Sequence, residues 1–511
     1  MAAQSQYAPS NLDHVEDLEK YQRNGFHPVH LGDNLDKLDS GRYRYQVIHK
    51  LGNGGFATVW LAHDLIDGGY VALKIVQASQ SSYGIPSAVE SILDAHPTNI
   101  FVTERRRFFI SGPNGRHVCQ VLPVTGPSLM ALSQSPYRLQ PAVCKTLARQ
   151  ATQALEFLHA RGLCHGGTSC CPCVTTCVKS DWHGHLHVED FTPSNLVLAL
   201  SPTLHQLSKQ DLLERLGTPV RDPVLATGPK TTSAPEYVVE PADLAKLDPS
   251  YLTTSLRVID FDQVFCFREP PPPGIPPNPG FGLGIPIVSL APEAIIEGAA
   301  GPASDIWALG CTLFRMRAGM QLLGDWHFNI ACNVLEEIFD ISGPPPPKWS
   351  KLQFRENGWP VLSPRSGTDE NISTEEYGQE PPDPDGDLKA KVYGIWDENR
   401  STPNTPGSSR SGTPPPTMAK SLPRSRDPSP SKVVQVTKSS ISWKVGPDVV
   451  PCWANIDGGF PHIHPDEAAQ FLDLLTRIFA YDVRQRITAA EILEHPWFTR
   501  GDEKREPASV F

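Results

Sequence analysis

The chain of 511 residues has no excess of basic residues and comparatively few apolar ones. Its 45 Lys and Arg against 56 Asp and Glu give a formal net charge of −11. This balance argues against bulk nucleic-acid binding and is compatible with an acidic surface for a basic partner. Hydrophobic residues make up 39%, and the 51 prolines are about twice the usual share. We therefore expect roughly three structural units, part of the chain remaining unfolded.

Long apolar runs and a disulfide pattern are also missing. No run of about 18 uncharged apolar residues exists, and the N-terminal stretch has neither a basic start nor an apolar segment, which disfavours membrane spanning and secretion. The eleven cysteines are an odd number, and five of them crowd residues 164–177. A disulfide framework would space them more evenly. We expect reduced thiols in an intracellular protein of the cytoplasm, the nucleus or both.

Hydrophobic periodicity divides the folded part into two. Residues 41–125 contain short β-rich runs broken by glycines, which predict an antiparallel sheet of five strands with one helix near 85–94. After residue 126 apolar residues recur at helical spacing, most clearly in a predicted helix over 141–160. The predicted fold class is α+β, with two lobes: a small β lobe with one helix and a mainly helical lobe.

Two segments are expected to lie outside this core. Residues 1–40 are polar and predicted to be mostly flexible, although 25–33 is apolar enough to dock on a neighbouring surface. Residues 362–440 are rich in Pro, Ser and Gly and poor in aromatics, so they are predicted to be disordered, because they bury too little apolar surface to offset the entropy of ordering. The helical lobe then comprises 126–361 and 441–498, with a tail over 499–511.

A glycine cluster and a lysine suggest phosphate binding. Gly52, Gly54 and Gly55 stand at a predicted strand–turn–strand, where the absence of Cβ atoms lets backbone N–H groups approach phosphate oxygens. Lys74 on the next strand is a point charge suited to phosphates, and Glu90 on the predicted helix could form an ion pair with it. Each feature alone has an ordinary alternative: a simple turn, a solvated lysine and a surface glutamate.

The segment VIDFD over 258–262 strengthens the phosphate interpretation. It is a short apolar strand that ends in Asp260, an arrangement that presents a carboxylate to Mg²⁺. Ala291-Pro292-Glu293, the motif DIWALG and Arg486 follow in order. A chance match of the whole ordered set is not expected. In this order the motifs resemble those of the eukaryotic protein kinases.

Three further segments narrow the resemblance. GFHPVHLGD at 25–33, LGNGGFATVWLA from Leu51, and GPNGRHVCQV with a following GPSL are similar to the SR-protein kinases, particularly their fungal branch. The resemblance covers about 25–340 and 441–498. It implies the bilobal protein-kinase fold, the cofactors ATP and Mg²⁺, and phosphate transfer to Ser or Thr. The implied partner is an Arg/Ser-rich protein connected with mRNA splicing, with no direct nucleic-acid or membrane contact, and the chain is expected to be a monomer.

The resemblance also implies roles for individual residues. Asp190 would be the catalytic base, Asn195 and Asp260 the metal ligands, and Glu90 the residue that orients Lys74. Leu122 would be the gatekeeper before an adenine-binding hinge at 123–125. The implied nucleotide-binding residues are Leu51, Gly52, Gly54, Gly55, Val59, Ala72, Lys74, Leu122 and Val124.

The predicted catalytic loop is interrupted. His165 is followed by Gly166, but Asp190 and Asn195 come only after the 23 residues 167–189. Deleting them restores the spacing His-x-Asp and then Asn five positions later. We hypothesise a retained intron or gene-model error. The alternative is a zinc cluster formed by Cys170, Cys171, Cys173 and Cys177 with His183, His185 and His187, although their spacing matches no pair of C-x₂-C motifs.

Four positions depart from the kinase pattern. Ala57 replaces the third glycine of the loop, and Gly166 stands where an Arg usually precedes the catalytic Asp, which is compatible with constitutive activity. Thr192 replaces a lysine that contacts the γ-phosphate, and Asp262 replaces the last glycine of D-F-G. These changes, together with displacement of Asp190 by 167–189, leave a catalytically impaired kinase-fold scaffold as the alternative function.

Overall fold

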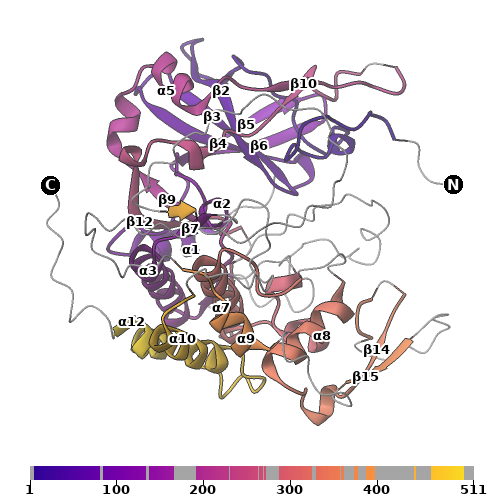
Figure 1. Cartoon of the computed structure of the whole chain (residues 1–511). Helices are drawn as coiled ribbons and strands as arrows, with labels where there is room; N and C mark the ends of the chain where they lie inside the picture. Colours follow the sequence, from indigo (N-terminus) through magenta and orange to yellow (C-terminus); the bar gives the residue numbers. More distant parts are fainter. Residues whose placement is uncertain are drawn as a thin grey trace, which may run out of the picture.

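The computed structural model has two lobes, one built on a β-sheet and one on helices (Figure 1). It describes residues 5–80, 85–133, 137–165, 191–229, 231–262, 264–268, 270–271, 287–324, 330–356, 358–361, 373–377, 387–397, 442–444 and 462–499. In Figure 1 the sheet lobe is above the helical lobe, and β9 and β12 lie between them. The predicted α+β, two-lobed architecture is confirmed.

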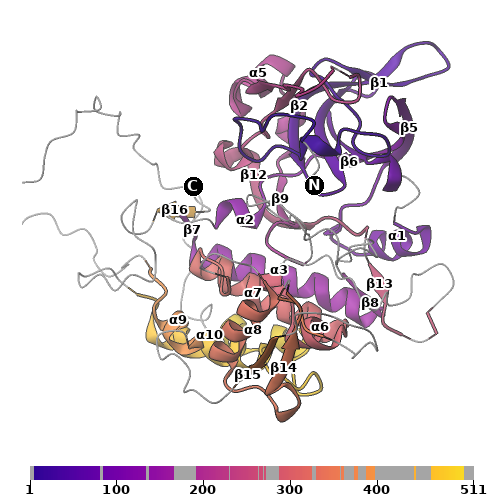
Figure 2. The same ribbon diagram turned by 90° about the vertical axis from the view of Figure 1, so that its right-hand side faces the viewer.

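The sheet lobe is a six-stranded antiparallel sheet in the order β1-β2-β3-β4-β6-β5. The strands are β1 (Asn34–Lys37), β2 (Tyr43–Asn53), β3 (Ala57–Asp64), β4 (Tyr70–Val76), β5 (Arg106–Gly112) and β6 (Gly115–Pro123). The prediction of five strands is wrong, because the sheet has a sixth, the short edge strand β1. Its four residues are too few to show a periodic pattern in the sequence. The one helix of this lobe, α1 (Ser87–Asp94), confirms the helix predicted near 85–94 and lies below the sheet, beside the helical lobe (Figure 2).

The helical lobe is centred on two long buried helices, α3 (Pro141–Ala160) and α7 (Pro302–Ala318). Leu147, Ala151 and Leu158 of α3 are fully buried in the main core, which confirms the predicted apolar face. The remaining helices are α2 (Leu129–Leu132), α6 (Pro292–Glu297), α8 (Ala331–Ser342), α9 (Leu388–Tyr393), α10 (Pro465–Ile478), α11 (Ala489–Leu493) and α12 (Pro496–Thr499). In the part of the chain that the structure describes, no helix is long and apolar enough to cross a membrane.

Five short two-stranded ladders complete the described structure. Two of them lie near the junction of the lobes: β8 (Leu163–Cys164) with β13 (Phe265–Cys266), and β9 (Leu196–Leu200) with β12 (Leu252–Val258). The others are β10 (Arg221–Pro223) with β11 (Tyr237–Val239), β14 (Lys351–Phe354) with β15 (Ser373–Glu376), and β7 (Tyr137–Leu139) with β16 (Ser442–Lys444).

A segment of the sequence assigned to the helical lobe instead covers the sheet. Residues 201–251 leave β9 and return to β12, forming α5 (Lys209–Leu216), the β10–β11 ladder and the short 3₁₀ helices η3 (Pro202–Gln206), η4 (Leu244–Lys246) and η5 (Pro249–Tyr251). Trp60 of β3 packs in one cluster with Val239, while its neighbour Leu61 packs in another with Leu212. Because adjacent strand residues point to opposite faces, this segment covers both faces of the sheet.

The N-terminal segment also packs on the sheet lobe. Tyr7, Leu18, Tyr21 and Phe26 form a buried cluster with Val238; Leu18 lies in the 3₁₀ helix η1 (Leu18–Lys20). The expectation of a mostly flexible extension over 1–40 is therefore corrected for the described residues from 5 onward. The segment is ordered because its few aromatic side chains meet a surface that is built by residues about 200 positions later, which no local pattern reveals.

The N-terminal segment also supplies a buried charge. Glu16 forms an ion pair with Lys50 of β2, and both side chains are almost fully buried. The Tyr21 hydroxyl donates to the same carboxylate at 2.5 Å. Each oxygen of this buried carboxylate therefore has a donor, as burial of a charge requires, and the pairing fixes how the N-terminal segment lies on β2.

Only two pieces of the 362–440 segment are described. Residues 373–377 form β15, and residues 387–397 include α9, where Val392, Ile395 and Trp396 are buried. These pieces belong to the helical lobe, so the predicted boundary at 362 is corrected for them. The rest of the segment predicted to be disordered, and most of the tail over 499–511, lies outside the described residues.

A buried ion pair fixes α6 in the helical lobe. Arg486 donates through its Nη1 and Nη2 atoms to the two carboxylate oxygens of Glu293, at 2.6 and 3.0 Å. The same guanidinium donates to the carbonyl oxygens of Ala303 and Ala480. Both charged side chains are at most 5% exposed. Removing one partner of such a pair strongly destabilises the folded protein, because the other charge stays buried without its counter-charge.

We predict that Glu293→Gln lowers the free energy of unfolding by roughly 3–5 kcal/mol, because it leaves the Arg486 guanidinium buried without a counter-charge. Urea unfolding followed by tryptophan fluorescence measures the change. Arg484→Ala is the matched control, since Arg484 is exposed and pairs only with its neighbour Asp482 among the described residues. A Glu293→Gln midpoint equal to that of the control would contradict the prediction.

Two histidines meet between the N-terminal segment and the sheet. The rings of His27 and His117 of β6 lie 5.0 Å apart between centroids. His27 Nδ1 and His117 Nε2 are both buried without a hydrogen-bond partner. Burial, with the neighbouring His117 and His30, lowers the pKa of His27 from 6.5 to about 4. The folded state therefore keeps His27 neutral where the unfolded chain binds a proton.

This pair predicts acid sensitivity of the sheet lobe. Because the folded-state pKa of His27 is depressed, its favourable contribution is fully present above about pH 6.5 and is lost as pH falls toward 4. The melting temperature should fall between pH 7.5 and 5, and the fall should be smaller in His27→Phe, which keeps a ring but cannot bind a proton. His462→Gln, at an exposed position, should keep the wild-type slope; an unchanged slope in His27→Phe would refute the assignment.

Candidate active site

The charged centre of the molecule lies where the lobes meet. Lys74 of β4 places its Nζ 2.7 Å from Asp260 Oδ1 and 2.7 Å from Asp262 Oδ2. Both aspartates follow β12, so a cation of the sheet lobe contacts two anions of the helical lobe. The three side chains are 17–24% exposed, which leaves them accessible to a small ligand while desolvation strengthens their interaction.

Strand register gathers most of the predicted nucleotide-binding residues around Lys74. In the antiparallel ladder Lys74 lies opposite Val59 of β3, and Ala72 lies opposite Leu122 of β6. Val59 in turn pairs with Gly52 of β2. Residues directly opposite in such a ladder are close neighbours. The geometry brings these residues together, whereas their contact with nucleotide stays a prediction, as it does for Leu51 and Val124.

The glycine turn between β2 and β3 is held by side chains from outside it. Gly54 donates its N–H to the carbonyl oxygen of Ala57 at 2.8 Å. The carbonyl oxygen of Gly55 accepts from Lys20 Nζ at 2.8 Å and from Gln77 Nε2 at 3.1 Å. The contact from Lys20 was missed in the sequence, because the N-terminal segment was expected to be flexible.

Asp260 is fixed by an unusual backbone conformation and by the next residue. Its φ is 65°, a left-handed conformation that is uncommon outside glycine and is found where surrounding structure enforces it. The ring of Phe261, 1% exposed, makes edge contacts with Phe101 at 5.3 Å and with His165 at 4.9 Å. Packing of Phe261 therefore directs Asp260 toward Lys74.

Asn195 lies beside the strand that leads to Asp260. Leu196 pairs with Val258 in the β9–β12 ladder, and Ile259 donates its N–H to the carbonyl oxygen of Asn195 at 3.0 Å. Asn195 is 1% exposed. Carboxylate and amide oxygens are donor types that Mg²⁺ accepts, so the chemistry of Asp260 and Asn195 is compatible with magnesium, and their role as metal ligands stays a prediction. Asp190, the predicted catalytic base, lies outside the described residues.

Glu90 does not form the ion pair that the resemblance implies. Its Oε1 is buried without a hydrogen-bond partner, and burial, followed by repulsion from Glu104, raises the pKa of its carboxyl group. Lys74 instead forms ion pairs with Asp260 and Asp262. The expectation that Glu90 orients Lys74 is therefore corrected: a carboxylate at the position of the usual glycine, Asp262, has reached the ammonium group.

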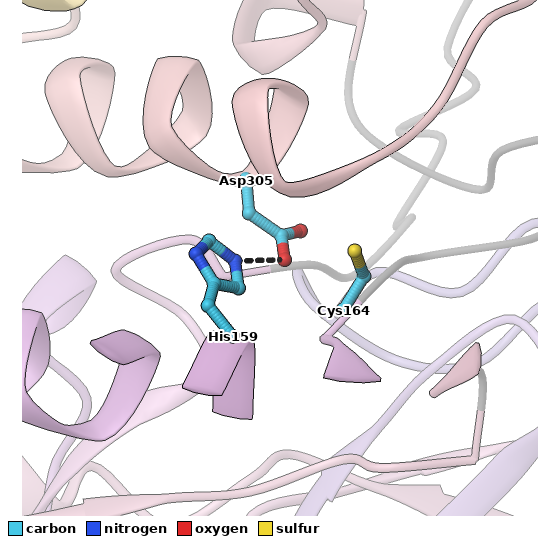
Figure 3. Close-up of side chains that lie close together, drawn as sticks. All are labelled: His159, Cys164 and Asp305. Carbon is cyan, nitrogen blue, oxygen red and sulfur yellow. Dashed lines mark hydrogen bonds and ion pairs between the residues drawn. The ribbon is translucent and has the colours of Figure 1, made fainter. Parts of the chain in front are cut away.

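Asp305 of α7 lies beside His159 and Cys164, just before the interrupted loop (Figure 3). Its Oδ2 lies 3.0 Å from His159 Nε2 and accepts the backbone N–H of His165 at 3.1 Å. Cys164 lies with them, and the ligand atoms of His159, Cys164 and Asp305 fall within 4.8 Å of one another. The two hydrogen bonds to this oxygen fix the carboxylate of Asp305, and burial raises the pKa of the Cys164 thiol well above its usual value.

The residues on the two sides of 166–190 contact one another. The rings of His165 and Phe191 lie 5.6 Å apart between centroids, and Thr312 of α7 donates its hydroxyl to the carbonyl oxygen of Phe191 at 3.0 Å. The predicted insertion 167–189 and its possible zinc ligands lie outside the described residues, so both hypotheses about it stay predictions. Thr192 is described and is buried, at 3% exposed.

Comparison with known proteins finds similarity to protein kinases. Residues 288–498 match the family model described as protein kinase domain. The chain is 34% identical to SRSF protein kinase 3 of Homo sapiens over 162 residues, which is 30% of this chain and 28% of that protein. It is 33% identical to protein kinase dsk1 of Schizosaccharomyces pombe over 193 residues, 35% of this chain and 34% of that protein.

A third relative is serine/threonine-protein kinase SKY1 of Saccharomyces cerevisiae, 31% identical over 164 residues, 29% of this chain and 21% of that protein. The chain thus spans about a third or less of the length of these curated relatives. The matched kinase domain over 288–498, the two-lobed fold and the ordered motifs make the chain similar to the eukaryotic-type protein kinases, and among them to the SRSF protein kinases.

Proposed function

We propose that the chain is an ATP-dependent serine/threonine protein kinase that phosphorylates Ser in Arg/Ser-rich proteins connected with mRNA splicing. The observation that carries the proposal is the contact of Lys74 with Asp260 between the lobes, at 2.7 Å. A lysine for phosphates beside a carboxylate for a divalent cation is the pairing that phosphoryl transfer requires. Retention of Lys74, Asn195 and Asp260 favours the enzyme over a catalytically impaired scaffold.

The proposed mechanism assigns each residue one task. Lys74 and the glycine turn would position the phosphates of ATP, and Asp260 and Asn195 would hold magnesium. The metal, when bound, would neutralise charge on the phosphates. Asp190 would accept the proton of the substrate Ser hydroxyl as its oxygen bonds to the γ-phosphorus and the bond to the bridging oxygen breaks, releasing ADP. Catalysis then depends on positioning and electrostatic stabilisation.

The substrate class is supported by the relatives and by charge. Two matched curated relatives are SRSF protein kinases or serine/threonine-protein kinases by name, and the net charge of −11 suits a basic Arg/Ser-rich partner. We further propose that the protein acts as a monomer in the cytoplasm, the nucleus or both. It would bind protein substrate without contacting nucleic acid or membrane.

Activity on peptides tests the proposal. Arg/Ser-rich peptides should be phosphorylated in preference to acidic or Ser-Pro peptides, and the preference should weaken as salt screens exposed charge contacts. Lys74→Met and Asp190→Ala should each lower turnover by at least about 10²-fold, since each removes a group that acts in the transition state. The exposed Lys246→Met is the matched control for Lys74→Met. A preference for Ser-Pro peptides would indicate another kinase group.

Deletion of residues 167–189 tests the interrupted loop. The deletion joins Gly166 to Asp190 and leaves two residues between His165 and Phe191, whose rings already contact each other at 5.6 Å between centroids. We predict that the shortened chain transfers phosphate from ATP faster than the full chain, because Asp190 regains the spacing of the kinase loop. Equal turnover by both forms would contradict the retained-intron hypothesis, and activity lost only on deletion would support a functional insertion.

A further inference from the structure

Asp262 contacts Lys74, and the glycine of the usual kinase motif could not make this contact because it has no side chain. Where the motif has glycine, this chain has a carboxylate whose Oδ2 lies 2.7 Å from Lys74 Nζ. The adjacent Phe261 is buried, and the aspartates on its two sides both reach the same ammonium group. Charge-assisted hydrogen bonds of this length are among the stronger ones in proteins.

Glu90 stands in a different charge environment. The cation that acts on its carboxyl group is Arg107 of β5, and the nearby anions are Glu104 and Asp94. Arg107 is itself occupied by Glu104, with Nε to Oε1 and Nη2 to Oε2 both at 2.8 Å. Glu90 therefore has a buried oxygen without a hydrogen-bond partner and no ion pair among the described residues.

We propose that Asp262 is the residue that positions Lys74, in the role that the kinase resemblance assigns to Glu90. The inference deepens the proposed function and rests on it for its role in nucleotide binding. If Asp260 held magnesium, Lys74 would still need a fixed anion beside it. Asp262 meets this requirement because it follows Asp260 by two residues and comes from the same rigidly packed segment. Helix α1 is then not required to bring a carboxylate to the site.

The first test needs no nucleotide. The full-length chain is treated with an amine-reactive reagent, and labelling of Lys74 is followed by mass spectrometry. Asp262→Asn replaces one of the two carboxylates that hold the Lys74 amine with a weaker, uncharged acceptor, so it should raise the labelling rate of Lys74 at least fivefold. Glu90→Gln should change it by less than twofold, as should Asp243→Asn, an exposed carboxylate that pairs with Lys246. Unchanged melting temperatures show that the variants are folded.

The second test measures binding of magnesium-ATP by calorimetry. Asp262→Asn should raise Kd at least tenfold and more than Glu90→Gln does. In a Lys74→Met background the effect of Asp262→Asn should disappear, because a double-mutant cycle isolates the coupling between the two side chains. Asp262→Glu should restore part of the affinity, since it returns the charge.

The outcomes separate the two proposals. The role of Asp262 is overturned if Lys74 is labelled faster in Glu90→Gln than in Asp262→Asn. It is also overturned if the effect of Asp262→Asn on Kd persists in the Lys74→Met background. A different result would overturn the proposed function alone: the wild-type chain melts normally and fails to bind magnesium-ATP, while Asp262→Asn still speeds the labelling of Lys74. The positioning of Lys74 by Asp262 would then stand.

Discussion

The contact between Lys74 and the two aspartates is the constraint on which the rest of the site depends. It joins a strand of the sheet lobe to the segment after β12, and its three charges are only partly exposed. Three such charges are costly to desolvate unless their geometry is maintained. The surroundings maintain it from both sides: antiparallel pairing fixes Lys74 on β4, and the packing of Phe261 against Phe101 fixes the aspartates.

The sheet that carries Lys74 is stabilised by segments that are distant in sequence. Asn114, at the turn between β5 and β6, donates to the carbonyl oxygens of Phe26 and Ser233 at 2.7 and 2.6 Å. One side chain thus holds both the N-terminal segment and residues 201–251 on the same hairpin. Lys20 extends this covering layer to the carbonyl oxygen of Gly55, so the layer reaches the glycine turn as well as the outer faces of the sheet.

Sequence reasoning succeeded where a signal is local and failed where it is not. The helices over 87–94 and 141–160 repeat apolar residues at helical spacing, and the order of Gly52, Lys74 and Asp260 follows the motif along the chain. Residues 201–251 form short elements without a period and pack on residues more than 100 positions away. Asp262 reaches Lys74 because of the direction its side chain takes after Asp260, whose backbone is left-handed. A linear motif does not encode that direction.

The same contacts bear on the interrupted catalytic loop. Its first residue, His165, is held by Asp305 and Phe261, and the residue after the gap, Phe191, is held by Thr312. Asp305 and Thr312 both belong to α7, so this one helix holds the described residues on the two sides of 166–190. In the shortened chain Asp190 would be presented between these two fixed positions.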